Sequence, residues 1–509
     1  MSRSPLNILN DMPFQAVAFL CVLFLNAFFQ FIVLRDFGFV FTDTDQSIMW
    51  LGLKDYANCD FHEPRMYGQA YNTMLESFLA VPLFKLGFIP QKALAITTSW
   101  MAFFPFLLLS MLSYRRKRFL AAIVILSIPL LLPIRYAMLT SLPRGFVSGI
   151  FVASFGLIAL YYERSRMALA VFGFCSVLGF SVNPNSVILT LPVLVFLFLR
   201  GYDRGVFYAS VGLGALLATI IHLGVAYWYL KHPYYALHGF DLYYSPSLIL
   251  PRFQDMDMYF NDVTPVFWKT GFLSLVVFVI GAMYAAWKRE FSLAVFLAVI
   301  PVLVLLTFGL NKVHDASDSI FFSYSRMYLA LPVLFAVWAS FLPDRLSRNI
   351  ILLMLVPFAF TLQKITLFRS TVDTELKRVH HIPVRVERMK TIETECANLA
   401  RLCDEYSIDL IIVSNHYSYD FLTYGCPALH SDLPNTLRPV YERRTWRLIE
   451  DAEKVYGRIL VIDDNRKLDL EFPFVSQLPG HGYFYLIEDN DVATITLLDL
   501  MEMEVRAFR

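Results

Sequence analysis

Charged residues are scarce in this sequence. Asp, Glu, Lys and Arg make up 17% of its 509 residues, against about 25% in a typical soluble domain. Hydrophobic residues account for 57% of the chain and the mean hydropathy is +0.54, which is the composition of a membrane-embedded protein. The net charge of +1 carries no information about nucleic acid. No Lys/Arg-rich run resembles a nucleic-acid footprint, so no nucleic-acid partner is expected.

Metal, redox and nucleotide motifs are also missing. The cysteines show no CxxC spacing, and Cys396 and Cys403 would lie about 10 Å apart along the axis of a predicted helix, too far for a disulfide. A zinc-protease HExxH motif beginning at His62 fails, because position 66 is Met66 and Pro64 breaks the required helix. The C-terminal part has no GxGxxG or P-loop sequence, and therefore no nucleotide site is predicted.

Long apolar runs predict eleven membrane spans, because about 20 apolar residues are needed to cross the hydrocarbon core. No small-residue cleavage site follows the first run, so we expect a retained anchor rather than a signal peptide. The runs fall near 14–34, 93–113, 119–134, 145–161, 167–182, 186–199, 206–229, 264–286, 291–310, 328–342 and 350–367.

Basic residues in short loops predict the orientation. If the apolar run at 72–89 were a span, the basic residues 115–118 would lie outside, against the positive-inside rule. We therefore expect 72–89 to form a helix at the outer surface, with the N-terminus cytoplasmic and the C-terminus outside. The loops that then face the cytoplasm carry Arg115–Arg118, Arg164/Arg166, Arg200/Arg204, Lys288/Arg289 and Arg345/Arg348.

The composition changes near residue 368, after which charges are common and no run reaches span length. Apolar periodicity predicts a helix over 385–406, and short apolar runs predict strands at 409–413, 458–462 and 483–487. The fold class is thus a mainly α, polytopic membrane protein with a C-terminal soluble α/β domain. We expect a membrane domain at 1–367, with its first outer loop at 35–92, and an extracytoplasmic domain at 368–509.

The first outer loop holds most of the unusual chemistry. A dense set of ionisable residues follows directly behind the first apolar run, where charge close to lipid is costly and therefore indicates function. An ordinary solvated surface loop is the alternative. The ionisable residues are Asp43, Asp45, Asp55, Asp60, His62, Glu63, Arg65 and Glu76.

Asp43 and Asp45 precede an amphipathic stretch that begins at Gln46. Either aspartate can cap that helix, with Asp45 placed at or near the N-cap. Alternatively, one of them is a general base, because a carboxylate near a low-dielectric surface can accept a proton from a sugar hydroxyl. Arg65 and Tyr67 suit a phosphate group, although Arg65 can equally pair with a neighbouring carboxylate.

A resemblance supports the functional reading. The TDTDQ sequence at 42–46, the stretch from Tyr67 to Phe84 and the basic SYRRKR at 113–118 resemble the first outer loop and following span of C-type-fold bacterial membrane glycosyltransferases. That superfamily includes the protein O-mannosyltransferases and the lipid A aminoarabinose transferases. It places an acidic motif on one juxtamembrane helix, a second juxtamembrane helix after it, and basic residues at the end of the next span.

The resemblance implies an inverting glycosyltransferase in a bacterial inner membrane. It implies a polyprenyl-phosphate-linked sugar as donor, and a lipid, glycan or protein as acceptor at the outer face. Asp45, alone or together with Asp43, would be the base; Gln46 stands where many members carry Glu, which leaves both the base and any metal open. No cofactor is required, and a divalent cation at Asp43 and Asp45 is possible. The loop residues expected to bind substrate are His62, Tyr67, Gln69, Tyr71 and Glu76.

Arginines at the outer ends of spans are expected to bind the donor phosphate. Arg144 and Arg326 are the candidates there, together with Arg65 in the first loop. Arg135 and Lys312 would be considered if none of these three binds the phosphate. The alternative is that these residues only snorkel to lipid headgroups. Asn183 and Asn185 are weaker candidates for donor contacts, and a helix-breaking turn explains them nearly as well. His238 and Asp241 lie in the Tyr-rich loop 230–263, where aromatic rings suit sugars, although Tyr is also the ordinary residue of a membrane interface.

Two other classes of function stay open. A transporter or flippase for a lipid-linked sugar would need ionisable residues within its spans, and the middles of these spans hold few, with His222 as the main exception. A non-catalytic membrane assembly protein would use the outer domain to bind a partner. Activity of the purified chain with a lipid-linked sugar would separate the enzyme from both.

The orientation itself can be tested by cysteine-accessibility labelling. We expect single cysteines introduced at 114–118 to react only from the cytoplasmic side, and cysteines in 368–509 only from outside, because the basic loops stay in the cytoplasm. A tail that reacts only from the cytoplasm would contradict both the topology and an active site at the outer face.

Overall fold

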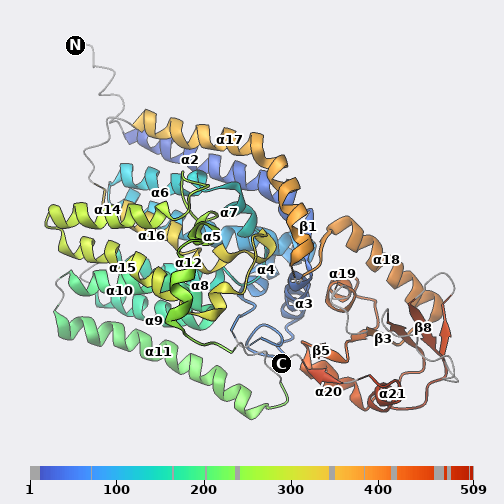
Figure 1. Cartoon of the computed structure of the whole chain (residues 1–509). Coiled ribbons are helices and arrows are strands. Elements are labelled where there is room, and N and C mark those ends of the chain that lie inside the picture. Colours follow the sequence, from blue (N-terminus) through green and yellow to red (C-terminus); the bar gives the residue numbers. More distant parts are fainter. Residues whose placement is uncertain are drawn as a thin grey trace. The chain divides into compact units, whose positions relative to one another are not determined.

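The chain forms two compact units and is mainly helical, as the computed structural model shows (Figure 1). The first unit comprises Met1–Gly38, Thr98–Leu223 and Asp241–Ile382, and the second comprises Phe39–Thr97, Gly224–Phe240 and Pro383–Arg509. Each unit therefore joins segments that are far apart in sequence. The structure describes residues 12–69, 71–162, 165–200, 203–235, 241–342, 350–382, 384–413, 421–463, 475–478, 483–503 and 505–507.

The first unit is built from apolar helices. Each predicted apolar run overlaps one of these helices. Helices α2 and α17 lie side by side (Figure 1). Most of α5 and most of α11 belong to this unit, and the rest of each helix belongs to the second unit. The helices are α2 (Met12–Val33), α5 (Pro90–Arg115), α6 (Phe119–Leu131), α7 (Ile134–Leu139), α8 (Ser148–Phe155), α9 (Arg166–Val182), α10 (Val187–Leu199), α11 (Arg204–Lys231), α12 (Ile249–Arg252), α13 (Met256–Phe260), α14 (Leu273–Trp287), α15 (Phe291–Thr307), α16 (Leu331–Ala339) and α17 (Ile350–Lys377).

Three helical segments are long and apolar enough to cross a membrane, among the residues that the structure describes. They are Gln15–Gly38, Pro90–Arg115 and Arg204–Lys231. Several other apolar helices are shorter, so the number of eleven spans stays a prediction. In Arg204–Lys231 only 17% of the most apolar window is buried within the protein, and an apolar helix with so much exposed surface is stable when lipid surrounds it.

Two predicted features of the first unit have local causes in the sequence. The turn at Asn183-Pro184-Asn185 separates α9 from α10, because Asn183 accepts the backbone N–H of Asn185 at 3.1 Å and proline cannot continue the helix. The run predicted at 264–286 becomes helical only from Leu273, because the preceding residues form turns closed by Thr264, whose hydroxyl donates to two backbone carbonyls.

The second unit contains a five-stranded sheet in the order β4-β3-β6-β8-β7. β3 is parallel to β4 and β6, whereas β8 is antiparallel to β6 and β7. The strands match the three predicted runs, and additional short strands complete the unit. The strands are β1 (Phe41–Asp43), β2 (Val386–Arg388), β3 (Leu410–Val413), β4 (Asn435–Leu437), β5 (Val440–Glu442), β6 (Ile459–Ile462), β7 (Val475–Gln477), β8 (Phe484–Ile487) and β9 (Arg506–Ala507).

Alternate residues of β3 enter two different hydrophobic cores. Leu410 and Ile412 pack with α21 (Thr494–Leu500), while Ile411 and Val413 pack with α18 (Met389–Tyr406). The second of these cores also contains Ile48, Met49 and Trp50 of α3 (Thr44–Asn58). The helix of the first loop therefore shares its core with the sheet of the C-terminal segment, and the two fold as one unit.

The helix predicted at 385–406 begins later than expected. Residues 386–388 form β2, which pairs antiparallel with β1, so that Asp43 lies opposite Val386. α18 starts only at Met389, and its buried positions include the predicted Ile392, Cys396 and Leu399. The second helix of the first loop, α4 (Leu75–Lys85), lies inside the predicted range 72–89.

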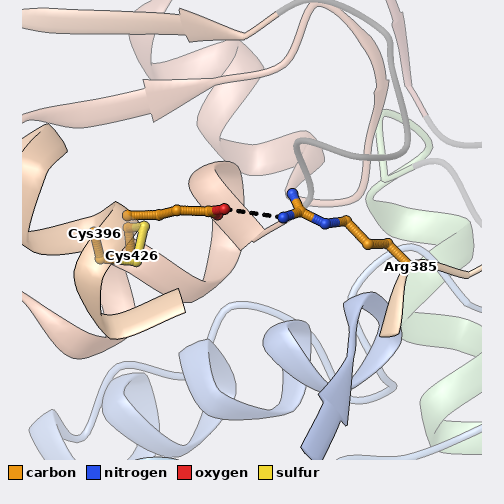
Figure 2. The surroundings of a disulfide bond; sticks show 4 residues. Arg385, Cys396 and Cys426 are labelled. Atoms are coloured by element: carbon orange, nitrogen blue, oxygen red, sulfur yellow. Dashed lines mark hydrogen bonds and ion pairs between the residues drawn. A yellow bond between two sulfur atoms is a disulfide. The ribbon is translucent and has the colours of Figure 1, made fainter. Parts of the chain in front are cut away.

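A disulfide joins Cys396 of α18 to Cys426 of α19 (Cys426–Leu429), as Figure 2 shows. The cysteine spacing excluded only a bond between Cys396 and Cys403, and Cys403 is indeed a free, buried thiol. Beside the disulfide, Arg385 donates to Glu395 at 2.9 Å. Because α19 also contacts α3, the disulfide fixes a part of the core against which the acidic loop packs.

Candidate functional site

Asp43 begins helix α3. It ends strand β1 in an extended conformation, and its Oδ1 accepts the backbone N–H groups of Asp45 and Gln46 at 3.1 and 3.3 Å. Its Oδ2 accepts the side-chain amide of Gln46 at 2.6 Å. The side chain is fully buried. Asp43 is therefore the N-cap residue. Of the two aspartates that the sequence offered as caps, Asp43 takes this position, and Asp45 lies two residues further on, near the cap.

Asp45 lies in the first turn of α3, and 25% of its side chain is exposed. Its Oδ1 accepts a hydrogen bond from Arg443 at 3.1 Å, although the two residues are 398 positions apart in sequence. Arg443 follows β5 at a corner fixed by Glu442, whose carboxylate accepts the backbone N–H groups of Arg438 and Arg444 at 3.0 and 2.9 Å. The C-terminal segment thus supplies the cation that orients the Asp45 carboxylate.

Gly68 lets the first loop approach Arg443 closely. Its φ of +71° is unfavourable for other residues, and a Cβ at this position would lie 3.2 Å from the Arg443 Cα and 3.3 Å from its carbonyl oxygen. A side chain at position 68 would push the Arg443 backbone away. Gly68 therefore allows the first loop to lie close to Arg443, a role that the sequence alone did not indicate.

The residues around Asp43 and Asp45 suit a guanidinium better than a divalent cation. Both Asp43 oxygens already accept hydrogen bonds from α3, and the Arg443 fork faces Asp45. Across the described residues, no group of three or more His, Cys, Asp or Glu side chains could hold a metal ion. Because metal sites for Mg²⁺ or Ca²⁺ need several available oxygen ligands, this donor set does not fit such an ion.

A second cluster of the first loop surrounds Tyr67. The fully buried Tyr67 donates its hydroxyl to Asp55 at 2.6 Å, and burial raises the pKa of Asp55. His62 stacks on Trp446 with ring centres 3.6 Å apart, and burial lowers the pKa of His62, so that the ring is neutral at pH 7. Tyr67 and His62, both predicted to bind substrate, thus hold the loop against the C-terminal segment.

Glu63 is the most perturbed carboxylate of the loop. Only 5% of the residue is exposed, and burial raises its pKa to about 8. Its Oε2 accepts the Tyr229 hydroxyl at 2.9 Å, and that hydroxyl in turn accepts the Arg65 backbone N–H at 3.3 Å. The raised pKa favours the protonated form of Glu63 at neutral pH, and its hydrogen bond with Tyr229 ties the loop to the end of α11.

The other loop candidates differ in their exposure. Gln69 is buried and accepts the side-chain amide of Asn72 at 3.1 Å. Glu76 is fully buried in the first turn of α4, where the helix dipole favours a negative charge. Tyr71 and Arg65 are half-buried, and burial lowers the pKa of the Arg65 guanidinium. Tyr71 and Arg65 are therefore the members of this group with side-chain surface that a ligand can reach.

In the first unit, the structure brings Arg144 and Arg326 together. Both are only 4% exposed, and both guanidinium groups lie within 6 Å of the same two rings, those of Phe146 and Phe322. Arg144 donates to the carbonyl oxygen of Phe321, and Arg326 donates to that of Asp315. Two positive charges thus lie near the same two aromatic rings, and each guanidinium also donates to a backbone carbonyl group.

Asn185 supports this arginine pair. Its side-chain amide donates to the carbonyl oxygens of Phe146 and Arg326 at 2.7 and 3.3 Å, and Asn183 donates to that of Gly145 at 3.0 Å. Sequence analysis proposed donor contacts or a turn for these asparagines. The structure shows the turn, and it adds that both side chains fix the backbone around Arg144 and Arg326.

Arg135, a reserve candidate for the phosphate, lies instead among carboxylates. It donates to Asp262 at 2.6 Å and to Glu375 at 2.5 Å, and Asp318 lies 3.4 Å away. Burial raises the pKa of Glu375 to about 7. Because carboxylates already compensate its charge, Arg135 is a weaker candidate for a phosphate ligand than Arg144 or Arg326.

The remaining candidates contribute little to these clusters. Lys312 pairs with Asp315 at 2.8 Å. Asp241 is exposed, and its carbonyl oxygen accepts the side-chain amide of Asn311 at 2.7 Å. His238 lies outside the described residues.

The buried Glu63 generates a testable pH dependence. Its pKa is about 8 in the folded protein against an ordinary value of 4.5, so between these pH values the folded state binds a proton that the unfolded state has lost. Stability should therefore fall as pH rises through this window, by up to about 1.4 kcal/mol per pH unit. Thermal unfolding of the parent and of Glu63→Gln from pH 5 to pH 8 should show a flatter profile for the variant.

Asp60→Asn is the matched control for this experiment, because Asp60 is exposed in the same loop. Its unfolding profile should follow that of the parent. Identical profiles for the parent and Glu63→Gln would contradict the protonated state of Glu63.

Comparisons with known proteins place the fold. No protein-family model and no curated protein matches the sequence. The chain is similar in structure to ArnT from Cupriavidus metallidurans, whose crystal structure is of the apo state, with a TM-score of 0.54 over 94% of this chain and 98% of that one. The sequence identity is 12%, so the similarity is one of fold. This confirms the resemblance at the level of the C-type fold, which the chain shares with ArnT.

Proposed function

We propose that this chain is an inverting glycosyltransferase that transfers a sugar from a polyprenyl phosphate carrier to an acceptor at the outer face of a bacterial inner membrane. The fold of ArnT supports a membrane-embedded sugar transferase. The observation that carries the proposal is the difference in exposure between the two aspartates of the acidic motif. Asp43 is buried as the cap of α3, whereas Asp45, two residues on, keeps an accessible carboxylate.

Asp45 is the proposed base. Its carboxylate takes the proton from the acceptor hydroxyl, and the resulting oxygen nucleophile attacks the anomeric carbon of the donor sugar from the face opposite the phosphate. The bond between that carbon and the phosphate oxygen breaks, and the lipid phosphate leaves with the bonding electrons. Arg443 at 3.1 Å orients the carboxylate, and no step requires a metal ion.

Arg144 and Arg326 are the proposed ligands of the lipid phosphate, with Arg65 of the first loop as a further candidate. Their surroundings of carbonyl groups and aromatic rings position the charge before the donor arrives. Such preorganised charge in a water-poor site stabilises a developing negative charge better than solvated charge does. Tyr71 has the exposure needed for a sugar contact, while Tyr67, Gln69, Glu76 and His62 act through the shape of the loop.

The disulfide supports an extracytoplasmic second unit. Disulfides persist in oxidising compartments such as the periplasm and are rare in the cytosol. The bond between Cys396 and Cys426 and the basic loops therefore point to the same orientation. Both support an outer location for the acidic loop, which shares a core with the disulfide-bonded segment.

A transporter would be favoured by ionisable groups within the apolar helices. To His222 the structure adds Lys364 of α17, which the sequence analysis overlooked: it is fully buried, donates to the Pro129 carbonyl at 3.3 Å and lies 3.8 Å from the centre of the Phe29 ring. His222 pairs with Ser181 at 3.0 Å. Neither residue is joined to a series of polar groups among the described residues, so the enzyme remains the better-supported function.

Asp45→Asn tests the base. The substitution keeps the shape of the side chain and removes the proton acceptor, so turnover with a lipid-linked sugar should fall by about 10²–10⁴-fold while the thermal midpoint stays near that of the parent. Asp43→Asn should retain most activity, because asparagine caps helices as well as aspartate does. Full activity of Asp45→Asn would move the base to Asp43 or contradict a base in this motif.

Arg→Lys variants of Arg65, Arg144 and Arg326 test the phosphate site. Lysine keeps the charge but loses the planar fork that binds phosphate bidentately. At a true contact, the donor KM should rise by about tenfold or more while the acceptor KM stays unchanged. Arg135→Lys is the control, because it disturbs a partly buried arginine whose charge carboxylates already compensate.

A loss of stability alone would lower the yield of all four variants without a donor-specific change in KM. If Arg65→Lys, Arg144→Lys and Arg326→Lys all keep the donor KM of the parent, this assignment is wrong and another residue of the outer face binds the phosphate.

A further inference from the structure

A cavity of about 630 Å³ lies in the first unit, away from the residues assigned above. It is bounded by the C-terminal ends of α5, α10 and α16, together with the segment that follows α8. Arg326 precedes the start of α16, whereas the cavity lies at the other end of that helix, beside Ser340. The residues that matter for its chemistry are Arg116, Arg118, Tyr162, Arg200, Ser340 and Phe341.

The arginines of the cavity are positioned by neutral groups. Arg116 donates to the carbonyl oxygen of Tyr161 at 2.6 Å and lies 5.0 Å from the centre of the Tyr162 ring. Arg118 donates to the carbonyl oxygen of Ser340 at 3.0 Å. Among the described residues, no carboxylate pairs with Arg116 or Arg118. Their positive charge is therefore held in place without being compensated.

Arg200 adds a third guanidinium from a different helix end. It stacks over the rings of Phe196 and Phe341 at 4.9 and 5.3 Å, an arrangement that keeps the charge and restricts the side chain. Three cations thus converge on one concave surface from two different helix ends. An ordinary positive-inside bias requires basic residues near the membrane, but it does not require them to line a cavity.

We propose that this cavity binds the phosphate of an anionic phospholipid headgroup. Guanidinium forks match phosphate oxygens in geometry and charge. The helices that end here are apolar up to the cavity, so the acyl chains of a bound lipid can lie along their surface while the headgroup enters between the arginines. Basic pockets between membrane helices on the cytoplasmic side are typical sites for anionic headgroups. The site is independent of the proposed catalysis.

The experiment is native mass spectrometry of the full-length chain in neutral detergent, titrated with phosphatidylglycerol or with phosphatidylcholine of the same acyl composition. The parent should retain phosphatidylglycerol in preference to phosphatidylcholine. Arg116→Gln/Arg118→Gln should weaken phosphatidylglycerol binding by about tenfold or more, because charge-assisted hydrogen bonds are lost.

Arg115→Gln/Lys117→Gln is the matched control. It removes the same charge from the same exposed loop, but neither residue lines the cavity, so binding should stay within about twofold of the parent, well below the loss expected for a charge-assisted contact. An equal loss in both double variants would overturn the proposal in favour of a diffuse electrostatic effect. Equal retention of both lipids, or displacement of phosphatidylglycerol by inorganic phosphate at equal concentration, would also overturn it.

Discussion

The cap that Asp43 places on α3 is the constraint on which the acidic loop depends. The first turn of a helix leaves backbone N–H groups without partners, and Asp43 satisfies two of them from a strand that is itself paired with β2. Since β1 fixes the position of Asp43 and Asp43 fixes the start of α3, the direction of the Asp45 side chain is determined as well. A loop without this cap would leave the Asp45 carboxylate free to rotate away from Arg443.

The C-terminal segment contributes directly to the acidic site. It supplies Arg443 to Asp45 and Trp446 to His62, and its core contains Ile48 and Trp50 of α3. The C-terminal segment thus helps to position the side chains of the acidic loop, because its residues contact Asp45 and His62 directly. Changes far from the acidic loop in sequence can alter the orientation of the Asp45 carboxylate.

Local patterns in the sequence predicted local structure well. The strands β3, β6 and β8 and most of α18 follow from apolar runs and periodicity, and Asp43 was one of the two aspartates named as the cap of α3. Contacts between distant residues could not be predicted, because spacing carries no information about them. Arg443 beside Asp45, the disulfide between Cys396 and Cys426, and the shared aromatic surroundings of Arg144 and Arg326 all belong to this class. The burial of Glu63 and Tyr67 was missed for a related reason, since polar residues in a loop are ordinarily solvated.

The pairing of β1 with β2 also sets a delay in biosynthesis. Asp43 lies opposite Val386, so roughly 340 residues must be added after the acidic motif before its partner strand exists, which takes about 20–70 s at ordinary rates of synthesis. During that interval the loop has emerged but cannot adopt its final conformation. Membrane insertion and assembly of the acidic site are therefore separate events, and a chain that stops before β2 would carry the acidic motif without the strand that positions it.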